Sequence, residues 1–304
     1  MSLQSRQRKN QPRNKRAENP PKMVLQNRDR QVLTGVYRFR FLNSQQIEAL
    51  FFNTSSKPRG LQPACLRRLY LMYHNGFLDR ISLPVVMGEG REAEVYALDE
   101  LGAVEVGLIL GIDRPAVQWQ PKSNKVKPLF LNHSLSISDT WVIVSSLAGD
   151  GYLELVKTMT ETELKSAEMK NKVPYVMRGA RMERKIVDAY FAIQFAHKDS
   201  VYHFMYEDDQ GTETKEVWQS KIKAHLHFRN SGLSEKHYGT RNYRLLTKTV
   251  NQRRLQNLKK WTEEAGGGRF FWFTTKDELD IWNPTTFLNP IWQIATDEGR
   301  HGLV

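Results

Sequence analysis

The sequence predicts an α+β fold in two parts, and three observations support this prediction. Between residues 28 and 98, helical apolar stripes are followed by two strand patterns around a loop that contains glycine. From about residue 152 to 280, strand and helix patterns alternate, which is typical of a domain built on a β-sheet. The chain has 304 residues, 40% of them hydrophobic, which is enough for two cores.

The N-terminal part resembles a winged helix in the order of its elements. Asn43 and Gln46 have the spacing of a capping box, Pro63 suits the first turn of a helix, and Asn75–Gly76 suits a helix end. Three helices followed by two strands are expected, in chain order, at about 30–39, 44–52, 61–75, 77–83 and 93–98. The loop between the strands is the expected wing.

The third helix of such a module is the one that reaches base edges in the major groove of duplex DNA. Outside its apolar stripe this helix carries Gln62, Arg67, Arg68 and His74. The residues expected to hold phosphates or lie on the wing are Lys57, Arg59 and Arg91. Two alternatives stay open: these charges are ordinary solvated side chains, or the module contacts protein instead of DNA.

Positive charge is concentrated at the beginning of the chain. The formal charge is +12, and the first thirty residues hold nine basic side chains against two acids, so +7 lies there: Arg6, Arg8, Lys9, Arg13, Lys15, Arg16, Lys22, Arg28 and Arg30 against Glu18 and Asp29. Residues 1–27 are polar and are expected to form a disordered basic arm. Such an arm suits a polyanion such as double-stranded DNA, and the alternative is a solubilising tail.

The sequence favours a cytoplasmic protein. Cys65 is the only cysteine, which excludes an internal disulfide and a cysteine-based metal cluster. The N-terminus has no apolar segment of the secretory type, and no stretch reaches the roughly 18 apolar residues of a membrane helix. We therefore expect no membrane partner.

Behind the N-terminal module, residues 99–150 are expected to form a helical linker region and residues 151–304 the second domain. A helix is expected over 132–147. In the second domain we expect helices at 160–170, 212–229 and 250–264, and strands at 186–194, 201–208, 242–248 and 269–274.

A cluster of acids follows one of these strands. The segment 201–212 reads VYHFMYEDDQGT, and strand alternation places Glu207 and Asp209 on the same face. Asp188 lies on the preceding strand and would join them if the two strands are neighbours. Carboxylates at a strand end suit a hard divalent cation, so the sequence suggests a Mg²⁺ site formed by these three residues.

Lys221 falls on the apolar face of the helix that follows, whereas Lys223 points away from it. A buried ammonium group needs a partner, and the nearby acids are the obvious candidates. One interpretation is a metal-dependent phosphodiester site, with Asp188, Glu207, Asp209 and Lys221 as its catalytic residues. The other is a buried ion pair that only fixes the fold, and residue types alone leave both open.

Over roughly residues 28–275 the sequence resembles the replication-relaxation family of plasmids and other mobile elements. The resemblance rests on RFRFLNSQQIEALFF, LRRLYLMYHNGFLDRI, LNHSLSISD at 131–139, VDAYF at 187–191, and EDDQGTE at 207–213 followed by Lys221. It implies a winged helix joined to a domain that resembles the restriction-endonuclease fold.

The family's acids map onto this sequence one by one. Asp188 matches the aspartate of a Pro-Asp segment, with Val187 in place of the proline, and Lys221 matches a lysine in the following helix. The run Glu-x-Asp-x-Gly-Thr-Glu is matched by Glu207, Asp209 and Glu213, and Glu161 is a weaker match to an upstream acid. The nuclease fold normally carries its lysine two residues after the second acid, where this chain has Asp209.

The resemblance implies a DNA-binding protein of plasmid or mobile-element replication, mobilisation or its control, with protein partners in that process. Its second domain is then either a Mg²⁺-dependent endonuclease or a relic of one, because a fold can outlast its chemistry. The alternative from another functional class is a non-catalytic DNA-binding regulator or assembly adaptor.

Overall fold

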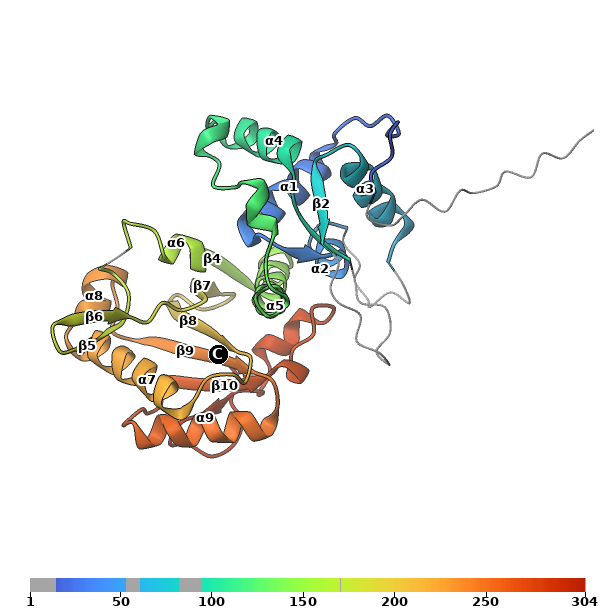
Figure 1. Cartoon of the computed structure of the whole chain (residues 1–304). Coiled ribbons are helices and arrows are strands. Elements are labelled where there is room, and N and C mark those ends of the chain that lie inside the picture. Colours follow the sequence, from blue (N-terminus) through green and yellow to red (C-terminus); the bar gives the residue numbers. More distant parts are fainter. Residues whose placement is uncertain (1–14, 53–60, 82–93, 170, 304) are drawn as a thin grey trace, which may run out of the picture. The chain divides into compact units, whose positions relative to one another are not determined.

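The computed structural model describes residues 15–52, 61–81, 94–169 and 171–303. The described residues divide into two compact units, one up to residue 134 and one from residue 135 onward (Figure 1). Both helices and sheets are present, which confirms the predicted α+β class.

In its described residues, the first unit combines α-helices with a small antiparallel sheet. Its elements are α1 (Asn27–Phe39), β1 (Leu42–Asn43), α2 (Ser44–Phe51), α3 (Pro63–His74), β2 (Leu78–Ile81), β3 (Val95–Leu98) and α4 (Glu100–Leu110). In the sheet, β3 lies between β1 and β2. The three helices and two strands expected from the sequence are all present, within a few residues of their predicted bounds. The predicted wing, with Arg91, lies outside the described residues.

The core of this unit forms where α1, α2 and α3 bury their apolar faces. Val32, Leu33, Ile47, Leu69 and Met72 are fully buried. The predicted capping box is present at the start of α2. The Asn43 side chain accepts from the backbone N–H of Gln46 over 2.9 Å, and the Gln46 side chain accepts from the backbone N–H of Asn43. Burial of the helix faces, together with a satisfied helix start, explains why this stretch folds as predicted.

Residues 15–26 make defined contacts, which corrects the expectation that a disordered arm extends to residue 27. Arg16 donates to the carbonyl of Leu78, and the backbone N–H of Ala17 donates to Nδ1 of His74 over 2.9 Å. Met23 and Leu25 pack against the core of the unit. Residues 1–14 lie outside the described part of the chain.

Residues 99–134 also belong to the first unit and do not form a separate linker. Ala103 and Val106 of α4 are buried in its core, and so are Val117 and Trp119 beyond that helix. Two short 3₁₀ helices, Arg114–Ala116 and Pro121–Asn124, lead to α5 (Pro128–Gly149), and the boundary between the units falls within α5. The lysine-rich composition of the segment obscured these apolar anchors.

The second unit is built on a six-stranded sheet in the order β11-β10-β9-β8-β7-β4. Its strands are β4 (Leu153–Thr160), β7 (Ala189–Phe195), β8 (Val201–Asp209), β9 (Tyr243–Thr249), β10 (Phe271–Thr275) and β11 (Gln293–Ile294). The strands β4, β7 and β8 form an antiparallel meander, whereas β8, β9 and β10 are parallel. The strands predicted at 186–194 and 201–208 are therefore neighbours.

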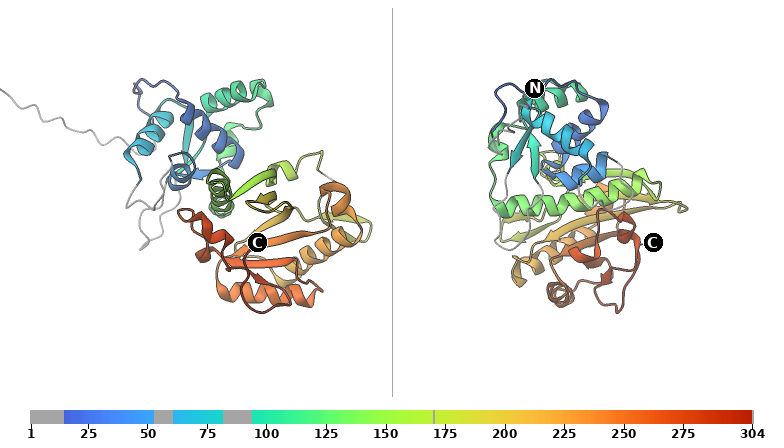
Figure 2. Two further views of the ribbon diagram at one scale, coloured as in Figure 1. Left: turned by 180° about the vertical axis from the view of Figure 1, so that it is seen from behind. Right: turned by 90° about the vertical axis from the view of Figure 1, so that its right-hand side faces the viewer.

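Helices cover the sheet on both faces (Figures 1 and 2). On one face, Trp141 of α5 packs edge-on against Phe191 of β7. On the other, α7 (Lys215–Asn230) and α9 (Gln252–Glu264) contribute Trp218, Ile222 and Leu258 to the main core. The alternation of β8 thus divides its side chains between an α5 face and an α7–α9 face.

Between β4 and β7 the structure differs from the sequence-based expectation. The predicted helix 160–170 is the end of β4 followed by a single turn, α6 (Glu161–Leu164). A hairpin follows, formed by β5 (Tyr175–Arg178) and β6 (Arg181–Arg184), and β5 contacts α7. Of the predicted segment, only Thr160 pairs with β7, and beyond Leu164 the chain continues in turns instead of a longer helix. A short helix, α8 (Leu233–Tyr238), completes the unit.

Within the described residues, every helix is too short or too polar to cross a lipid bilayer.

Candidate functional site: the acidic cluster at the end of β8

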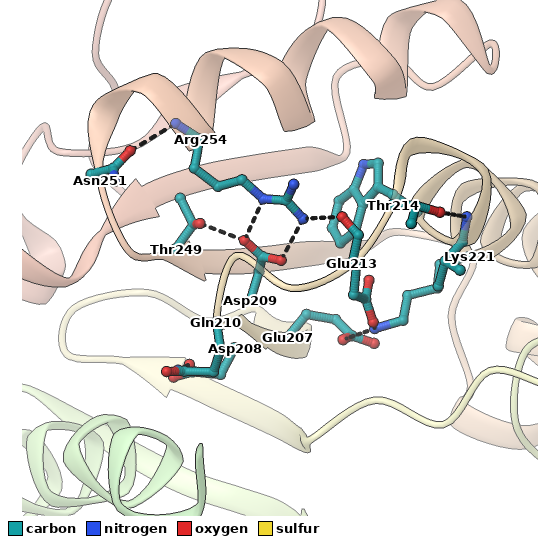
Figure 3. Close-up of polar contacts among 12 residues, drawn as sticks. Glu207, Asp208, Asp209, Gln210, Glu213, Thr214, Lys221, Thr249, Asn251 and Arg254 are labelled. Carbon is teal, nitrogen blue, oxygen red and sulfur yellow. Dashed lines mark hydrogen bonds and ion pairs between the residues drawn. The ribbon is translucent and has the colours of Figure 1, made fainter. Parts of the chain in front are cut away.

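The acidic cluster consists of Glu207, Asp208 and Asp209 at the end of β8, Glu213 in the turn that follows it (Figure 3), and Asp188 just before β7. Gly211 adopts φ +77°, a conformation that glycine reaches without strain, and it turns the chain out of the strand. Thr214 then caps α7 by accepting from the N–H of Val217. This turn brings Glu213 back beside the strand that carries Glu207.

Lys221 joins the strand end to α7, as the helical periodicity predicted. Its Nζ lies 2.6 Å from Oε2 of Glu207 and 2.9 Å from Oε1 of Glu213. Glu207 is almost fully buried, whereas the Lys221 side chain keeps 17% of its surface exposed and Glu213 keeps 26%. Solvent therefore reaches this pair of acids from the side of Lys221 and Glu213. Lys223 is exposed, as expected.

Asp209 points to a different cation. Both of its carboxylate oxygens accept from Arg254 of α9, at 2.9 and 2.8 Å, and Thr249 of the neighbouring strand donates to it over 2.6 Å. Arg254 also donates to the backbone carbonyl of Glu213 over 2.8 Å. A two-pronged arginine–carboxylate pair is among the stronger polar contacts in proteins, so Asp209 and Arg254 fix the turn after β8.

Asp208 lies on the opposite face of β8, toward α5. On β9, Lys248 is paired in register with Asp208, and the Nζ atom of Lys248 lies 2.8 Å from the Asp208 carboxylate. Both side chains are almost fully buried. Ser136 donates to Asp208 over about 3 Å, and Lys248 donates to the carbonyl of Ser136 over 2.6 Å. Because both charges are paired and hydrogen-bonded in the interior, this contact has the form of a structural ion pair.

Asp188 lies just before β7, where it accepts from the backbone N–H of Asp208 over 2.7 Å. The prediction that its strand neighbours β8 is confirmed by the register of Ala189 with Tyr206. Its negative charge acts on Glu207. Asp188 is thus part of the cluster and holds the backbone of β8 at the point where the acids are presented.

The electrostatics of the cluster centre on Glu207. Burial raises the pKa of Glu207, the Lys221 charge opposes that rise, and the charges of Asp188 and Glu213 add to it. Burial disfavours the charge of Lys221, but the two glutamates outweigh burial and raise the pKa of Lys221 above its ordinary value. Lys221 therefore stays cationic, and the carboxyl groups of Glu207 and Glu213 share its ammonium group. Perturbed pairs of this kind occur both in active sites and in structural networks.

The predicted Mg²⁺ ligands do not all converge. Asp209 is engaged by Arg254 through both oxygens, and within the described residues no group of three His, Cys, Asp or Glu side chains has metal-binding geometry. Two buried oxygens, Oε1 of Glu207 and Oε2 of Glu213, have no hydrogen-bond partner. Oxygen donors without partners suit a hard cation, so Glu207 and Glu213, rather than Asp209, fit such an ion.

Sequence reasoning missed the two other cations of the site. Lys248 lies on β9, whose residues are mostly buried, and a lysine in a buried strand needs a partner. Arg254 carried no comparable signal, because it stands beside Arg253 at the start of a polar helix. Only the packing of α9 against the sheet selects Arg254 as the partner of Asp209.

The predicted DNA-contacting residues divide into three groups. Lys57, Arg59 and Arg91 lie outside the described residues. Arg67 is exposed on α3, and Gln62 precedes the helix with its N–H bonded to Glu48 over 3.1 Å. By contrast, Arg68 forms a two-pronged pair with Asp29, which is fully buried, and His74 is buried against the segment before α1. Of the groups described, Arg67 is the basic side chain that α3 presents to solvent.

Comparison with known proteins gives one match. No curated protein and no solved structure matches the chain. The replication-relaxation family matches residues 33–242, which covers most of the first unit and the second unit through the acidic cluster and α8. The chain belongs to the replication-relaxation family.

Proposed function

We propose that this chain is a double-stranded-DNA-binding protein of plasmid or mobile-element replication, relaxation or mobilisation. Its first unit acts as a winged helix, and α3 enters the major groove. The observation that carries this proposal is the arrangement of α1, α2 and α3 on a three-stranded antiparallel sheet, in the chain order of a winged helix. Family membership supports the biological setting.

Charge supports the same proposal. The N-terminal thirty residues carry +7 of the formal +12, and the described end of that stretch lies along α3 and β2 through Arg16, Ala17 and Pro21. A basic segment of the chain is thus bound beside α3, the helix proposed to contact DNA bases. Phosphate contacts from such a segment add affinity that depends on salt but not on base sequence.

Arg67 is the side chain on which the proposal is tested. We expect the Arg67→Ala variant to bind a fluorescent plasmid-derived duplex more weakly than the native chain in an anisotropy titration. Lys223→Ala, which removes an exposed positive charge from α7, is the matched control and should bind as the native chain does. Equal affinity of native chain and Arg67→Ala would remove α3 from the DNA interface.

A second candidate function, metal-dependent phosphodiester cleavage, is supported by the partnerless oxygens of Glu207 and Glu213 beside Lys221. Glu207 and Glu213 would hold Mg²⁺, which when bound activates water and neutralises phosphate charge. Lys221 holds its positive charge at the exposed edge of the cluster, where a phosphate can approach. Asp188 keeps the backbone of β8 in place through Asp208. Arg254 fixes the turn that carries Glu213.

A further inference from the structure

A second charged feature lies at the other end of the parallel strands. Glu207 and its neighbours occupy the ends of β8 and β9, whereas a pocket of about 450 Å³ opens at the beginnings of these strands. Tyr202 and Asp209 are seven strand residues apart, which corresponds to roughly 20 Å. The residues that line the pocket include Tyr202, Arg229, Asn242, Arg244, Arg269 and Phe270, and Thr240 lies among them. Its volume is in the range of small-molecule sites.

The charge of this pocket is positive, because three arginines line it and one of them, Arg269, is paired with an acid. Within the described residues, neither Arg229 nor Arg244 forms an ion pair with a carboxylate. Arg269 pairs with Asp297 over 2.9 Å, and Arg241, which does not line the pocket, pairs with Glu235. Two half-buried guanidinium groups without an acid partner leave N–H donors available to an anion in the pocket.

Aromatic rings hold both arginines in place. The guanidinium carbon of Arg244 lies 4.3 Å from the ring centroid of Trp272 and 5.7 Å from that of Tyr202, and its Nη1 donates to the carbonyl of Leu303 over 2.6 Å. The guanidinium carbon of Arg229 lies 4.8 Å from the ring centroid of Phe270. The guanidinium groups are therefore ordered before any ligand binds, and their remaining N–H donors suit the geometry of a phosphate.

We propose that this pocket binds a nucleoside phosphate, with Arg229 and Arg244 on the phosphate and the Tyr202 ring against the base. Tyr202, which is half-buried and also contacts Arg244 and Phe195, supplies an aromatic ring to the lining, and Thr240 and Asn242 supply polar side chains. Stacking together with paired arginines is the combination that recognises nucleotides without strong base preference. The phosphate and base come either from a free nucleotide or from a single DNA strand. The proposal does not depend on duplex binding by α3.

Calorimetric titration of the full chain tests the pocket with dAMP, deoxyadenosine, inorganic phosphate and a short oligodeoxyadenylate. We expect dAMP or the oligonucleotide to bind more tightly than deoxyadenosine or phosphate alone. If dAMP binds as well as the oligonucleotide, the source is a free nucleotide, and preference for the oligonucleotide indicates a strand. Equal binding of dAMP, deoxyadenosine and phosphate, with no gain for the oligonucleotide, overturns the proposal.

Variants separate the pocket from general positive charge. Arg229→Gln should weaken binding of the preferred ligand by about tenfold, and Tyr202→Leu by a similar factor. Arg241→Gln removes the same charge from a neighbouring arginine outside the pocket and should stay within about twofold of the native chain. Should Arg229→Gln fail to fold in a thermal melt, Arg229→Lys keeps the charge and loses the fork, and it should still weaken binding. Equal losses in Arg229→Gln and Arg241→Gln contradict the assignment, whatever the result for duplex DNA.

Discussion

Lys221 reaches from α7 to Glu207 at the end of β8, across fourteen residues of sequence, and joins them over 2.6 Å. Glu213 shares the same ammonium group at 2.9 Å. One cation thus serves two carboxyl groups, each of which retains a buried oxygen without a partner. That imbalance separates this contact from the other two acid–cation pairs of the sheet, whose acids are more fully engaged.

If the second candidate function is correct, plasmid DNA incubated with Mg²⁺ or Mn²⁺ will be nicked by the native chain. Lys221→Ala and Glu207→Gln should each lower the nicking rate at least about a hundredfold, a common effect of removing a group that stabilises developing charge. Lys223→Ala, on the exposed side of α7, should nick at the native rate. Nicking that survives in Lys221→Ala would exclude the acidic cluster, and duplex binding without nicking would leave the DNA-binding function alone.

Asp208 and Lys248 are expected to stabilise the fold without taking part in DNA chemistry. Lys248→Met leaves the buried carboxylate of Asp208 without its cation, so it should lower the free energy of unfolding by about 3–5 kcal/mol. Adding Asp208→Asn removes that charge and should recover much of the loss. Urea denaturation of the native chain, the two single variants and the double variant measures the coupling. Additive losses would show that the two side chains do not act as a pair.

Arg68 is expected to have a structural role distinct from that of Arg67. Its guanidinium engages both oxygens of the fully buried Asp29 and joins α3 to α1, so Arg68→Ala should destabilise the first unit by about 2–4 kcal/mol. Arg67→Ala removes an exposed side chain and should change stability by less than about 0.5 kcal/mol. Thermal unfolding of both variants measures the difference in stability. If Arg68→Ala is as stable as Arg67→Ala, the structural role of Arg68 is refuted.

His225 is expected to make the second unit sensitive to acid. Burial, together with the nearby Lys221 charge, lowers the pKa of His225 to about 3. The unfolded imidazole therefore takes up a proton near pH 6.5 while the folded one does not. Stability from this group is complete above pH 6.5 and is lost toward pH 3, by about 1.4 kcal/mol for each pH unit. Denaturant midpoints at pH 5 and pH 7 should differ less in His225→Phe than in the native chain. An unchanged difference would show that other groups dominate.

The sequence predicted the secondary structure best where local signals agree with packing. The capping box at Asn43 and Gln46, and the strand that ends in three acids, both lie where predicted. The segment 153–184 was predicted poorly, because the pairing of β4 with β7 and the β5–β6 hairpin depend on partners that local patterns do not identify.

The site was predictable in its composition but not in its pairing. Helical periodicity correctly turned Lys221 toward the sheet, and strand alternation correctly placed Glu207 and Asp209 on one face. Sharing a face did not make them share a partner, because α9 brings Arg254 to Asp209 while α7 brings Lys221 to Glu207. The choice between these cations is made by helix packing over distances that the sequence pattern does not encode.

The salt dependence of duplex binding tests the central claim, DNA recognition by α3, most directly. Affinity of the native chain should fall steeply as salt rises, and the slope of log affinity against log salt should become shallower by about 1 in Arg67→Ala. Lys223→Ala should keep the native slope. A native slope in Arg67→Ala, together with native affinity, would contradict the account and place the DNA interface elsewhere on the chain.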